Sequence, residues 1–528
     1  MHAVVCLDVG STYTKGAAVD VDAGSLLATA SHPTTIATDV MDGVSAVLTE
    51  LAGALPGVDL SEVVGCSSAG GGLRLAVVGY ERAVTAEAGH RVGLSAGAKV
   101  VHVSAGRLDA AGLAALVADR PDVVLLVGGT DGGNAEVLLH NARALIAISG
   151  SGDAMIVDPA SISAPDVGGT QVGGTQVGGP GVGGTEVGGS GVVVPQAASR
   201  AEAPDRGSTP VGVPVVVAGN IDAREAVVDL LAAAGWRVLS AANVLPRIGV
   251  LDPLPARAAI REVFIAHVIG SKHLSASAAF VAMIRAATPD AVLAGVELLA
   301  DGAGTVAGVG DVVVVDVGGA TTDVYSVVTP DPLEAAVRRD VVEVMWRGRT
   351  VEGDLGVRWG APGVVDAGVA EHLLDRAEAA DLGGPALARL ADPDLLATDD
   401  VGRAVDARLA ELALTVALRR HARPQESGLV RRPGKDLRQV QLVVGSGGVL
   451  RYAGPEALQR ILAPATGDHA GGWKVPENAA LSIDARYVLA AAGLLARSYP
   501  QAAARLVTSA LVPLADQVPG RTGPPRRS

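Results

Sequence analysis

Two segments of the chain, at residues 4–15 and 312–324, repeat one pattern of residue types. The first reads Val-Val-Cys-Leu-Asp-Val-Gly-Ser-Thr-Tyr-Thr-Lys, and the second reads Val-Val-Val-Val-Asp-Val-Gly-Gly-Ala-Thr-Thr-Asp-Val. A short apolar run that is rich in β-branched residues and bounded by turn formers is typical of a buried strand. The glycines after each run predict a tight hairpin. Two such hairpins in one chain favour a fold with two related half-sites.

The chemistry of the two hairpins suits a bound phosphate. Glycine has no Cβ atom, so a phosphate can approach the backbone closely, and amide and hydroxyl groups can donate to its oxygens. Asp8 and Asp316 end their strands, where a carboxylate can hold hydrated Mg²⁺ or orient a water, and they are the predicted catalytic and metal-binding residues. The predicted phosphate-binding residues are Gly10, Ser11, Thr12, Thr14 and Lys15 in the first hairpin and Gly318, Gly319, Thr321 and Thr322 in the second. One copy alone would more often be an ordinary tight hairpin, but two copies favour half-sites that close on one nucleotide.

Two further segments fit a nucleotide site. Residues 441–450 place a strand before a glycine-rich turn, and the bare backbone at Gly445, Gly447 and Gly448 is predicted to lie against an adenosine. A turn of this kind taken alone is usually only a turn. A helix is expected at residues 487–495, where apolar residues recur on one face and Ala and Gly permit close packing of a second helix.

Three polar residues beside these motifs have two interpretations each. Lys15 is either a β-phosphate contact or a solvated surface lysine. Asp323 lies on the strand that leaves the second hairpin, where a packing or turn hydrogen bond is favoured over contact with a nucleotide. Cys66 is interpreted as part of the cleft lining or of a turn, because a catalytic cysteine needs a base partner and no histidine lies near it in the sequence.

Spacing along the chain predicts several domains. Strand–turn–helix–strand alternation follows residue 121 and again residue 215, which is typical of a doubly wound α/β unit. Between these stretches lie five tandem glycine-rich pentads, at residues 167–191, and residues 161–211 are predicted to be a disordered, flexible linker. The expected parts are a first lobe at 1–110, an inserted α/β unit with connecting helices at 111–310, a second lobe at 311–480, a connecting helix at 481–500 and a partly disordered tail at 501–528.

Composition and charge narrow the classes of function. The net charge of −14 argues against a general nucleic-acid or anionic-membrane surface, since both need clustered Lys and Arg. Two cysteines, Cys6 and Cys66, are too few for a disulfide framework or for an iron–sulfur cluster built from one chain. No basic segment precedes an apolar stretch and no uncharged run approaches membrane-spanning length, so we expect a cytoplasmic protein.

In their order along the chain, these motifs resemble the superfamily of ATPases that contains actin, heat-shock chaperones and sugar kinases. Within it the chain most resembles the MutL (GlmL) proteins associated with glutamate mutase, which are unrelated to the mismatch-repair protein of that name. The closer match is carried by residues 7–15, 125–134, 316–325 and 349–358.

The resemblance implies an α/β chain with an actin-like, ribonuclease H-like duplicated ATPase fold that carries an inserted α/β unit. It implies ATP and Mg²⁺ as ligands and a low rate of ATP turnover. It also implies that the partners are subunits of an adenosylcobalamin-dependent mutase, either glutamate mutase or an aminomutase, which this chain would reactivate in the manner of a chaperone. The alternatives are a small-molecule kinase of the sugar kinase type and a filament-forming actin relative.

Overall fold

The computed structural model describes residues 1–69, 73–81, 85–149, 213–269, 274–275, 277–329, 347–427, 430–432 and 434–517. The pentad tract and the rest of the predicted linker at 161–211 lie outside the described residues. Residues 500–510, within or beside the expected tail, form a helix, α17 (Pro500–Ala510), whereas residues 518–528 are outside the described part.

The first sheet contains the first hairpin. Strands β1 and β2 are antiparallel, β3 pairs antiparallel with β2, and β4 and β10 run parallel to β1. The sheet order is β10-β4-β1-β2-β3. Its strands are β1 (Ala3–Val9), β2 (Tyr13–Asp20), β3 (Ser25–Pro33), β4 (Val63–Ser67) and β10 (Ile284–Ala287).

The second sheet repeats this order around the second hairpin. Three antiparallel strands, β13, β14 and β15, are followed by β18 and β19, which run parallel to β13, and a short β20 closes the edge. The order is β15-β14-β13-β18-β19-β20, and the bounds are β13 (Val312–Val317), β14 (Thr322–Val327), β15 (Arg347–Glu352), β18 (Leu442–Ser446), β19 (Ala480–Ile483) and β20 (Val512–Pro513). The repeated order confirms the predicted fold class, a duplicated ribonuclease H-like α/β arrangement of the actin type.

The two sheets and their helices form successive layers. Successive residues of a strand face opposite sides of its sheet, and β1 shows this clearly. Val5 and Leu7 pack with α1 (Val40–Ala54) on the outer side, whereas Val4 and Cys6 join a central apolar cluster with helices α8 (Thr288–Asp301) and α16 (Val488–Leu495). The second sheet contacts the same central cluster with one face. Its other face is covered by α10 (Ala361–Ala370), α11 (Arg376–Ala391), α12 (Asp400–Ala422), α13 (Gly448–Tyr452) and α14 (Pro455–Leu462).

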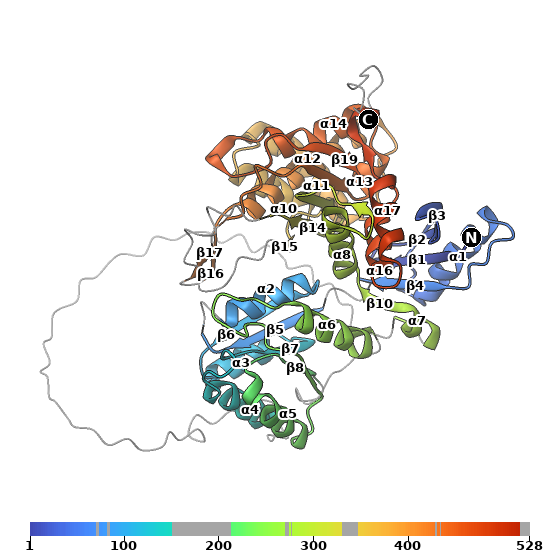
Figure 1. Ribbon diagram of the computed structural model, residues 1–528. Coiled ribbons are helices and arrows are strands. Elements are labelled where there is room, and N and C mark those ends of the chain that lie inside the picture. The colour runs from blue at the N-terminus through green and yellow to red at the C-terminus, as the bar shows by residue number, and fades with distance from the viewer. Residues whose placement is uncertain are drawn as a thin grey trace, which may run out of the picture.

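Helices α8 (Thr288–Asp301) and α16 (Val488–Leu495) lie between the two lobes, and α17 packs against both of these helices (Figure 1). Helices α8 and α16 cross at a point where each has a glycine. A Cβ atom at Gly295 would overlap the carbonyl oxygen of Leu489, and one at Gly493 would overlap the carbonyl oxygen of Ala291. The two backbones are therefore in direct contact, so any larger residue at the crossing must push the helices apart.

A third, wholly parallel sheet forms the inserted unit, which Figure 1 shows below the two lobes. Its order is β6-β5-β7-β8-β9, the doubly wound order in which the first strand pairs with the second and third. The strands are β5 (Arg74–Gly79), β6 (Lys99–Ala105), β7 (Val123–Leu126), β8 (Val215–Val217) and β9 (Val238–Ser240). The helices are α2 (Glu87–Ser95), α3 (Ala110–Ala118), α4 (Glu136–Ser149), α5 (Ile221–Ala233) and α6 (Leu254–Val263).

Strands β5 and β6 fall within the range 1–110 that the sequence suggested for the first lobe, yet they pair in the inserted sheet. A continuous apolar run such as Leu75 to Val78 is typical of any strand that is buried on both faces. Such a run does not reveal which of two sheets will receive it. The chain leaves the first lobe after β4 and returns through α7 (Ala278–Met283) to β10, the neighbour of β4.

Among the described residues, no helix is both long and apolar enough to span a membrane.

The helix crossing gives a first prediction. Gly493→Ala should lower the melting temperature measured by calorimetry, with a loss of about 2 kcal/mol or more in stability, because the new methyl overlaps the Ala291 carbonyl. Gly383→Ala is the matched control, since Gly383 lies inside α11 with no atom within 4 Å of an added Cβ. That control should gain about 0.5–1 kcal/mol from helix propensity. Equal melting temperatures for the two variants would contradict the crossing.

Candidate functional site

The turns of the two hairpins have the same backbone geometry. The amide of Gly10 donates to the carbonyl of Tyr13 at 3.1 Å, and the amide of Gly318 donates to the carbonyl of Thr321 at 2.9 Å. A Cβ atom on either glycine would lie 2.8 Å from that same carbonyl oxygen. Both turns therefore need glycine at this position for a steric reason, and this need explains why the two motifs share it.

The strand register also matches. Asp8 pairs with Lys15 across the first hairpin, and Asp316 pairs with Asp323 across the second. Directly opposed residues project from the same face of an antiparallel pair. One half-site therefore offers a carboxylate beside an ammonium, and the other offers two carboxylates.

Two of the predicted phosphate-binding hydroxyls are directed into their lobes. Thr14 and Thr322 occupy equivalent positions after the turns, and both are fully buried. The hydroxyl of Thr14 is 3.2 Å from that of Thr34, and the hydroxyl of Thr322 donates to the carbonyl of Leu355 at 2.6 Å. These contacts anchor the second strand of each hairpin.

The tips of the hairpins carry the accessible groups. Ser11 and Thr12 are exposed at the first tip. At the second tip Gly319 is partly exposed, and its carbonyl accepts from the amide of Arg358 at 2.8 Å, which ties the turn to the following loop. Thr321 donates to Asp323 at 3.3 Å. A phosphate chain between the tips would thus meet two exposed hydroxyls on one side and glycine backbone on the other.

Asp8 has three polar neighbours. Thr288, the first residue of α8, donates its hydroxyl to Oδ1 of Asp8 at 2.6 Å. The ammonium of Lys15 is 3.6 Å from Oδ2, and the thiol of Cys66 is 3.6 Å from Oδ1. Burial raises the pKa of Cys66 well above its usual value, with the charge of Asp8 acting in the same direction. Cys66 is therefore held as a thiol that lines the site, and a thiolate nucleophile is disfavoured.

Lys15 connects the two half-sites electrostatically. Burial alone would lower its pKa, but the charges of Asp8, Tyr487 and Asp316 outweigh this effect and raise the pKa to about 12. Its ammonium also lies 4.1 Å from the centre of the Tyr487 ring, which belongs to the second lobe. The side chain of Lys15 is only 27% exposed, so Lys15 is not a freely solvated surface lysine. Its interactions also involve more than one lobe.

Asp316 lies in a less favourable place for a charge. Burial raises its pKa to about 6, and the neighbouring carboxylates Asp323 and Asp8 add to the shift, while Lys15 and a hydrogen bond from Ser446 oppose it. A carboxylate that is only partly compensated has capacity left to bind a cation.

Asp323 is fully engaged. Arg349 on β15 forms an ion pair with it at 2.8 Å, and both side chains are largely buried. The structure thus supports the packing interpretation of Asp323.

The glycine-rich turn after β18 contains three different environments. A Cβ atom at Gly445 would meet the side chains of Leu450 and Leu462, so this glycine permits core packing. Gly447 has φ +112°, and a Cβ there would overlap the carbonyl of Val317 on the strand of the second hairpin. Gly448 faces open space, since an added Cβ atom would have only the Tyr487 hydroxyl nearby, at 3.8 Å.

Beside this turn the structure has a recess. Its walls come from β1, β2, β3, α13 and the start of α16, and they include Asp8, Lys15, Thr29, Arg451, Arg486 and Tyr487. The guanidinium of Arg451 lies 4.9 Å from the centre of the Tyr487 ring and 5.5 Å from that of the Tyr452 ring. Tyr452 is 75% exposed. No local sequence pattern marks Thr288, Arg451 or Tyr487 as site residues.

The carboxylates fit a magnesium ion better than a metal that needs a full protein cage. Within the described ranges, no group of three or more His, Cys, Asp or Glu residues is placed to hold a metal. Mg²⁺ commonly takes one or two carboxylates and completes its shell with water and phosphate oxygens. Asp8 and Asp316 could supply those two carboxylates.

The pKa of Asp316 gives a second prediction. An aspartate in the unfolded chain titrates near 3.8, whereas Asp316 in the folded protein titrates near 6. Between these values the folded protein holds the proton more tightly, so its stability falls as the pH rises through this window. In ligand-free protein, Asp316→Asn should therefore gain stability over the wild type by about 2 kcal/mol between pH 4 and pH 7. Melting curves at several pH values test this; a difference that does not change with pH would contradict the shift.

The chain is similar to known proteins over most of its length. A family model described as MutL protein matches residues 4–158 and 182–511. The protein MutL of Clostridium tetanomorphum is 32% identical over 525 residues, which cover 97% of this chain and 100% of that protein.

Among solved structures, nucleotide-free acetone carboxylase is 16% identical, with 94% of this chain and 70% of that chain covered and a TM-score of 0.36. Xylulose kinase from Bifidobacterium adolescentis is 13% identical, with 97% and 94% covered and a TM-score of 0.29. Gluconate kinase from Lactobacillus acidophilus is 10% identical, with 96% and 88% covered and a TM-score of 0.26. All three TM-scores are below 0.5, so the fold assignment rests on the sheet order.

Proposed function

The chain belongs to the MutL family, and we propose that it binds and slowly hydrolyses ATP as an accessory factor for an adenosylcobalamin-dependent mutase. Glutamate mutase or an aminomutase would be the client, and the factor would restore activity to a client that holds damaged cobalamin. The proposal that the chain binds ATP is supported by the pair of matched hairpins. Their strand-ending carboxylates, Asp8 and Asp316, both raise the pKa of Lys15.

Each residue of the site has a distinct part in this proposal. Ser11, Thr12 and the backbone amide of Gly319 would donate to the phosphate chain, with Lys15 at the β-phosphate. Mg²⁺ held by Asp8 and Asp316 would neutralise charge that develops on the transferred phosphoryl group.

The adenosine would lie on the side of the glycine-rich turn. Gly448 leaves its surface open, and Tyr487 and Arg451 border it. An aromatic ring and a guanidinium plane are both suited to stacking with a base.

Coupling to a partner follows from the two-lobed fold. A ligand that contacts both lobes favours their closed arrangement by its difference in affinity for the closed and open forms. Helices α8 and α16 lie between the lobes and cross with their backbones in direct contact, so closure of the lobes would displace this crossing and α8 with it. The chain has no Asp-x-His-x-x-Gly segment, and we therefore assign cobalamin to the partner.

Hydrolysis of ATP gives a third prediction. Asp316→Asn should keep the fold and lower the turnover of ATP at saturating Mg²⁺ by about a hundredfold or more, since it removes a positioned charge at the metal. Asp301→Asn is the control, because Asp301 is an exposed partner of Arg347 on the surface. Unchanged turnover in Asp316→Asn would remove this residue from the mechanism.

The same assay separates the proposal from a small-molecule kinase. A kinase would transfer phosphate to a sugar or another metabolite faster than to water. Phosphate transfer above the hydrolysis background would favour that alternative, and sedimentation that depends on nucleotide would favour a filament.

Action on a client gives a fourth prediction. A mutase inactivated by turnover or by hydroxocobalamin should regain activity when it is given this chain, ATP, Mg²⁺ and fresh adenosylcobalamin. Non-hydrolysable ATP should support one round of binding but no repeated recovery, because resetting the cleft needs release of phosphate. Asp316→Asn serves as the matched control. Recovery that is equally good without ATP, or absent with glutamate mutase and with the aminomutases, would count against the proposal.

A further inference from the structure

One turn of the inserted unit contacts residues that adjoin both half-sites. This turn joins α2 to β6 and contains Gly97, which has φ +75°. A Cβ atom at Gly97 would lie 2.8 Å from the backbone nitrogen of Asp290 and 3.2 Å from Pro289. The turn is therefore packed against the first residues of α8, with no room for a side chain.

The start of α8 is connected to the first half-site on one side and to the inserted unit on the other. Thr288 donates to Asp8 at 2.6 Å. Two residues later the fully buried Asp290 binds Arg257 at 2.8 Å and Arg261 at 2.5 Å, and both arginines belong to α6 of the inserted unit. A movement of Asp8 would thus reach the inserted unit through a single helical turn.

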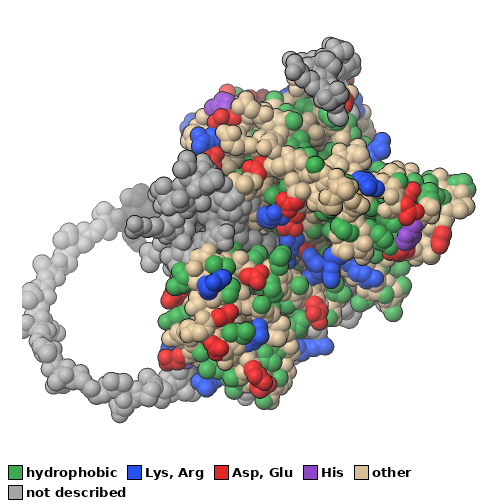
Figure 2. Space-filling view, in the orientation of Figure 1, with side chains coloured by type: hydrophobic (Ala, Val, Ile, Leu, Met, Phe, Trp, Pro, Cys, Tyr) green, Lys and Arg blue, Asp and Glu red, His purple; other side chains and the backbone are tan. Residues whose placement is uncertain are grey.

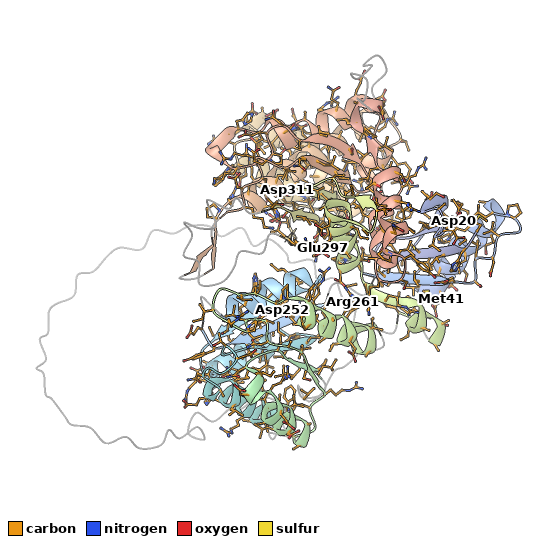
Figure 3. The ribbon with its side chains drawn as sticks, viewed as in Figure 1. Asp20, Met41, Asp252, Arg261, Glu297 and Asp311 are labelled. Carbon is orange, nitrogen blue, oxygen red and sulfur yellow. The ribbon has the colours of Figure 1, made fainter. Side chains whose placement is uncertain are left out.

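A second pair of the same kind reinforces this junction. Arg257 also forms an ion pair at 2.9 Å with Glu297, which lies farther along α8 than Asp290. Figure 3 shows Arg261 and Glu297 at the seam between the inserted unit and the rest of the molecule, and Figure 2 shows Lys, Arg, Asp and Glu side chains gathered along that seam.

The second half-site reaches the same turn through Arg349. Its guanidinium binds Asp323 at 2.8 Å with one nitrogen and donates to the carbonyl of Gly97 at 3.2 Å with another. Asp323 is the cross-strand partner of Asp316. The guanidinium is also 5.7 Å from the centre of the Tyr325 ring. Arg349 thus connects Asp323 of the second half-site to the backbone of the inserted unit.

Stability alone is a weak reason for such an arrangement. Arg349 is 8% exposed, and taking an arginine and a carboxylate out of water costs about as much free energy as their attraction returns. The planar fork of a guanidinium can bind two partners in fixed directions at once, which a lysine ammonium on a flexible stem does poorly. The geometry is therefore better explained by a positional role.

We propose that the Gly97 turn couples occupancy of the nucleotide site to the position of the inserted unit, with Arg349 and Thr288 as its two positioning residues. This inference rests on the proposed ATP function. Phosphate and metal between Asp8 and Asp316 change the charge that Thr288 and the Asp323–Arg349 pair experience. Because both contacts converge on one turn that has no free space, a small shift at either hairpin moves the inserted unit as a body.

Hydrogen exchange with and without Mg·ATP tests the coupling on the full chain. In the wild type, Mg·ATP should slow exchange of amides at residues 96–105 and 288–292 by about fivefold or more, the range typical of coupling between sites. Gly97→Ala should lose this protection, because its methyl forces the turn away from Asp290. Gly235→Ala is matched to it: Gly235 also follows a helix of the inserted unit and has φ +83°, but no atom lies within 4 Å of an added Cβ.

A second pair of variants keeps the test independent of strain in the turn. Arg349→Lys keeps the positive charge beside Asp323 but loses the fork, and it should bind ATP while losing protection at residues 96–105. Arg347→Lys, on the same strand in an exposed ion pair, should keep the wild-type protection.

The outcomes are distinct. Calorimetry that detects no ATP binding by the wild type would overturn both the proposed function and this inference. Binding of ATP without protection of the inserted unit, or equal protection in Gly97→Ala, Arg349→Lys and their controls, would overturn the coupling alone. Loss of protection in Gly235→Ala as well as in Gly97→Ala would assign the effect to strain and would also overturn it.

Discussion

The ammonium of Lys15 lies in the electric field of two strand-ending carboxylates, and the rest of the site is arranged around this interaction. Asp8 is on the same hairpin, whereas Asp316 belongs to the other lobe, so a single cation compensates charge on both sides of the cleft. The compensation is incomplete, since burial still raises the pKa of Asp316 to about 6. Phosphate oxygens at Lys15 together with a cation at the two aspartates would complete it. Bound Mg²⁺ and ATP would thus balance the charges of the ligand-free site.

The topology explains why residues far apart in the sequence meet here. Strands β1, β4 and β10 are parallel, so their carboxyl ends lie at one edge of the first sheet. This arrangement explains the contact between Asp8, near the end of β1, and Thr288, since α8 begins where β10 ends. The inserted unit is spliced between β4 and β10 and therefore lies next to the same edge. Its contact with Arg349 then brings the second half-site into the same junction.

The sequence predicted the local parts of this structure and missed the long-range ones. The two hairpins and the repeated half-site could be predicted, because glycine after an apolar run has a steric cause within a few residues. The duplicated fold was predicted from the resemblance to a known family, which rests on the order of several motifs along the chain. The burial of Thr14 and Thr322 was missed, since it depends on the cross-strand register and on partners such as Leu355. Thr288 and Gly97 carry no local signal at all: each matters through a contact with a residue distant in the chain. The assignment of individual residues to ATP and Mg²⁺ stays a prediction.

We propose that the two hairpins bind one nucleotide between them, and a crystal structure of the chain with Mg²⁺ and a non-hydrolysable ATP analogue would decide this. We expect one nucleotide per chain, with its phosphates between the tips at Ser11 and Gly319, the metal near Asp8 and Asp316, and the adenosine beside Gly448. Density for the nucleotide at the inserted sheet, or phosphates in contact with one hairpin only, would rule out a shared site.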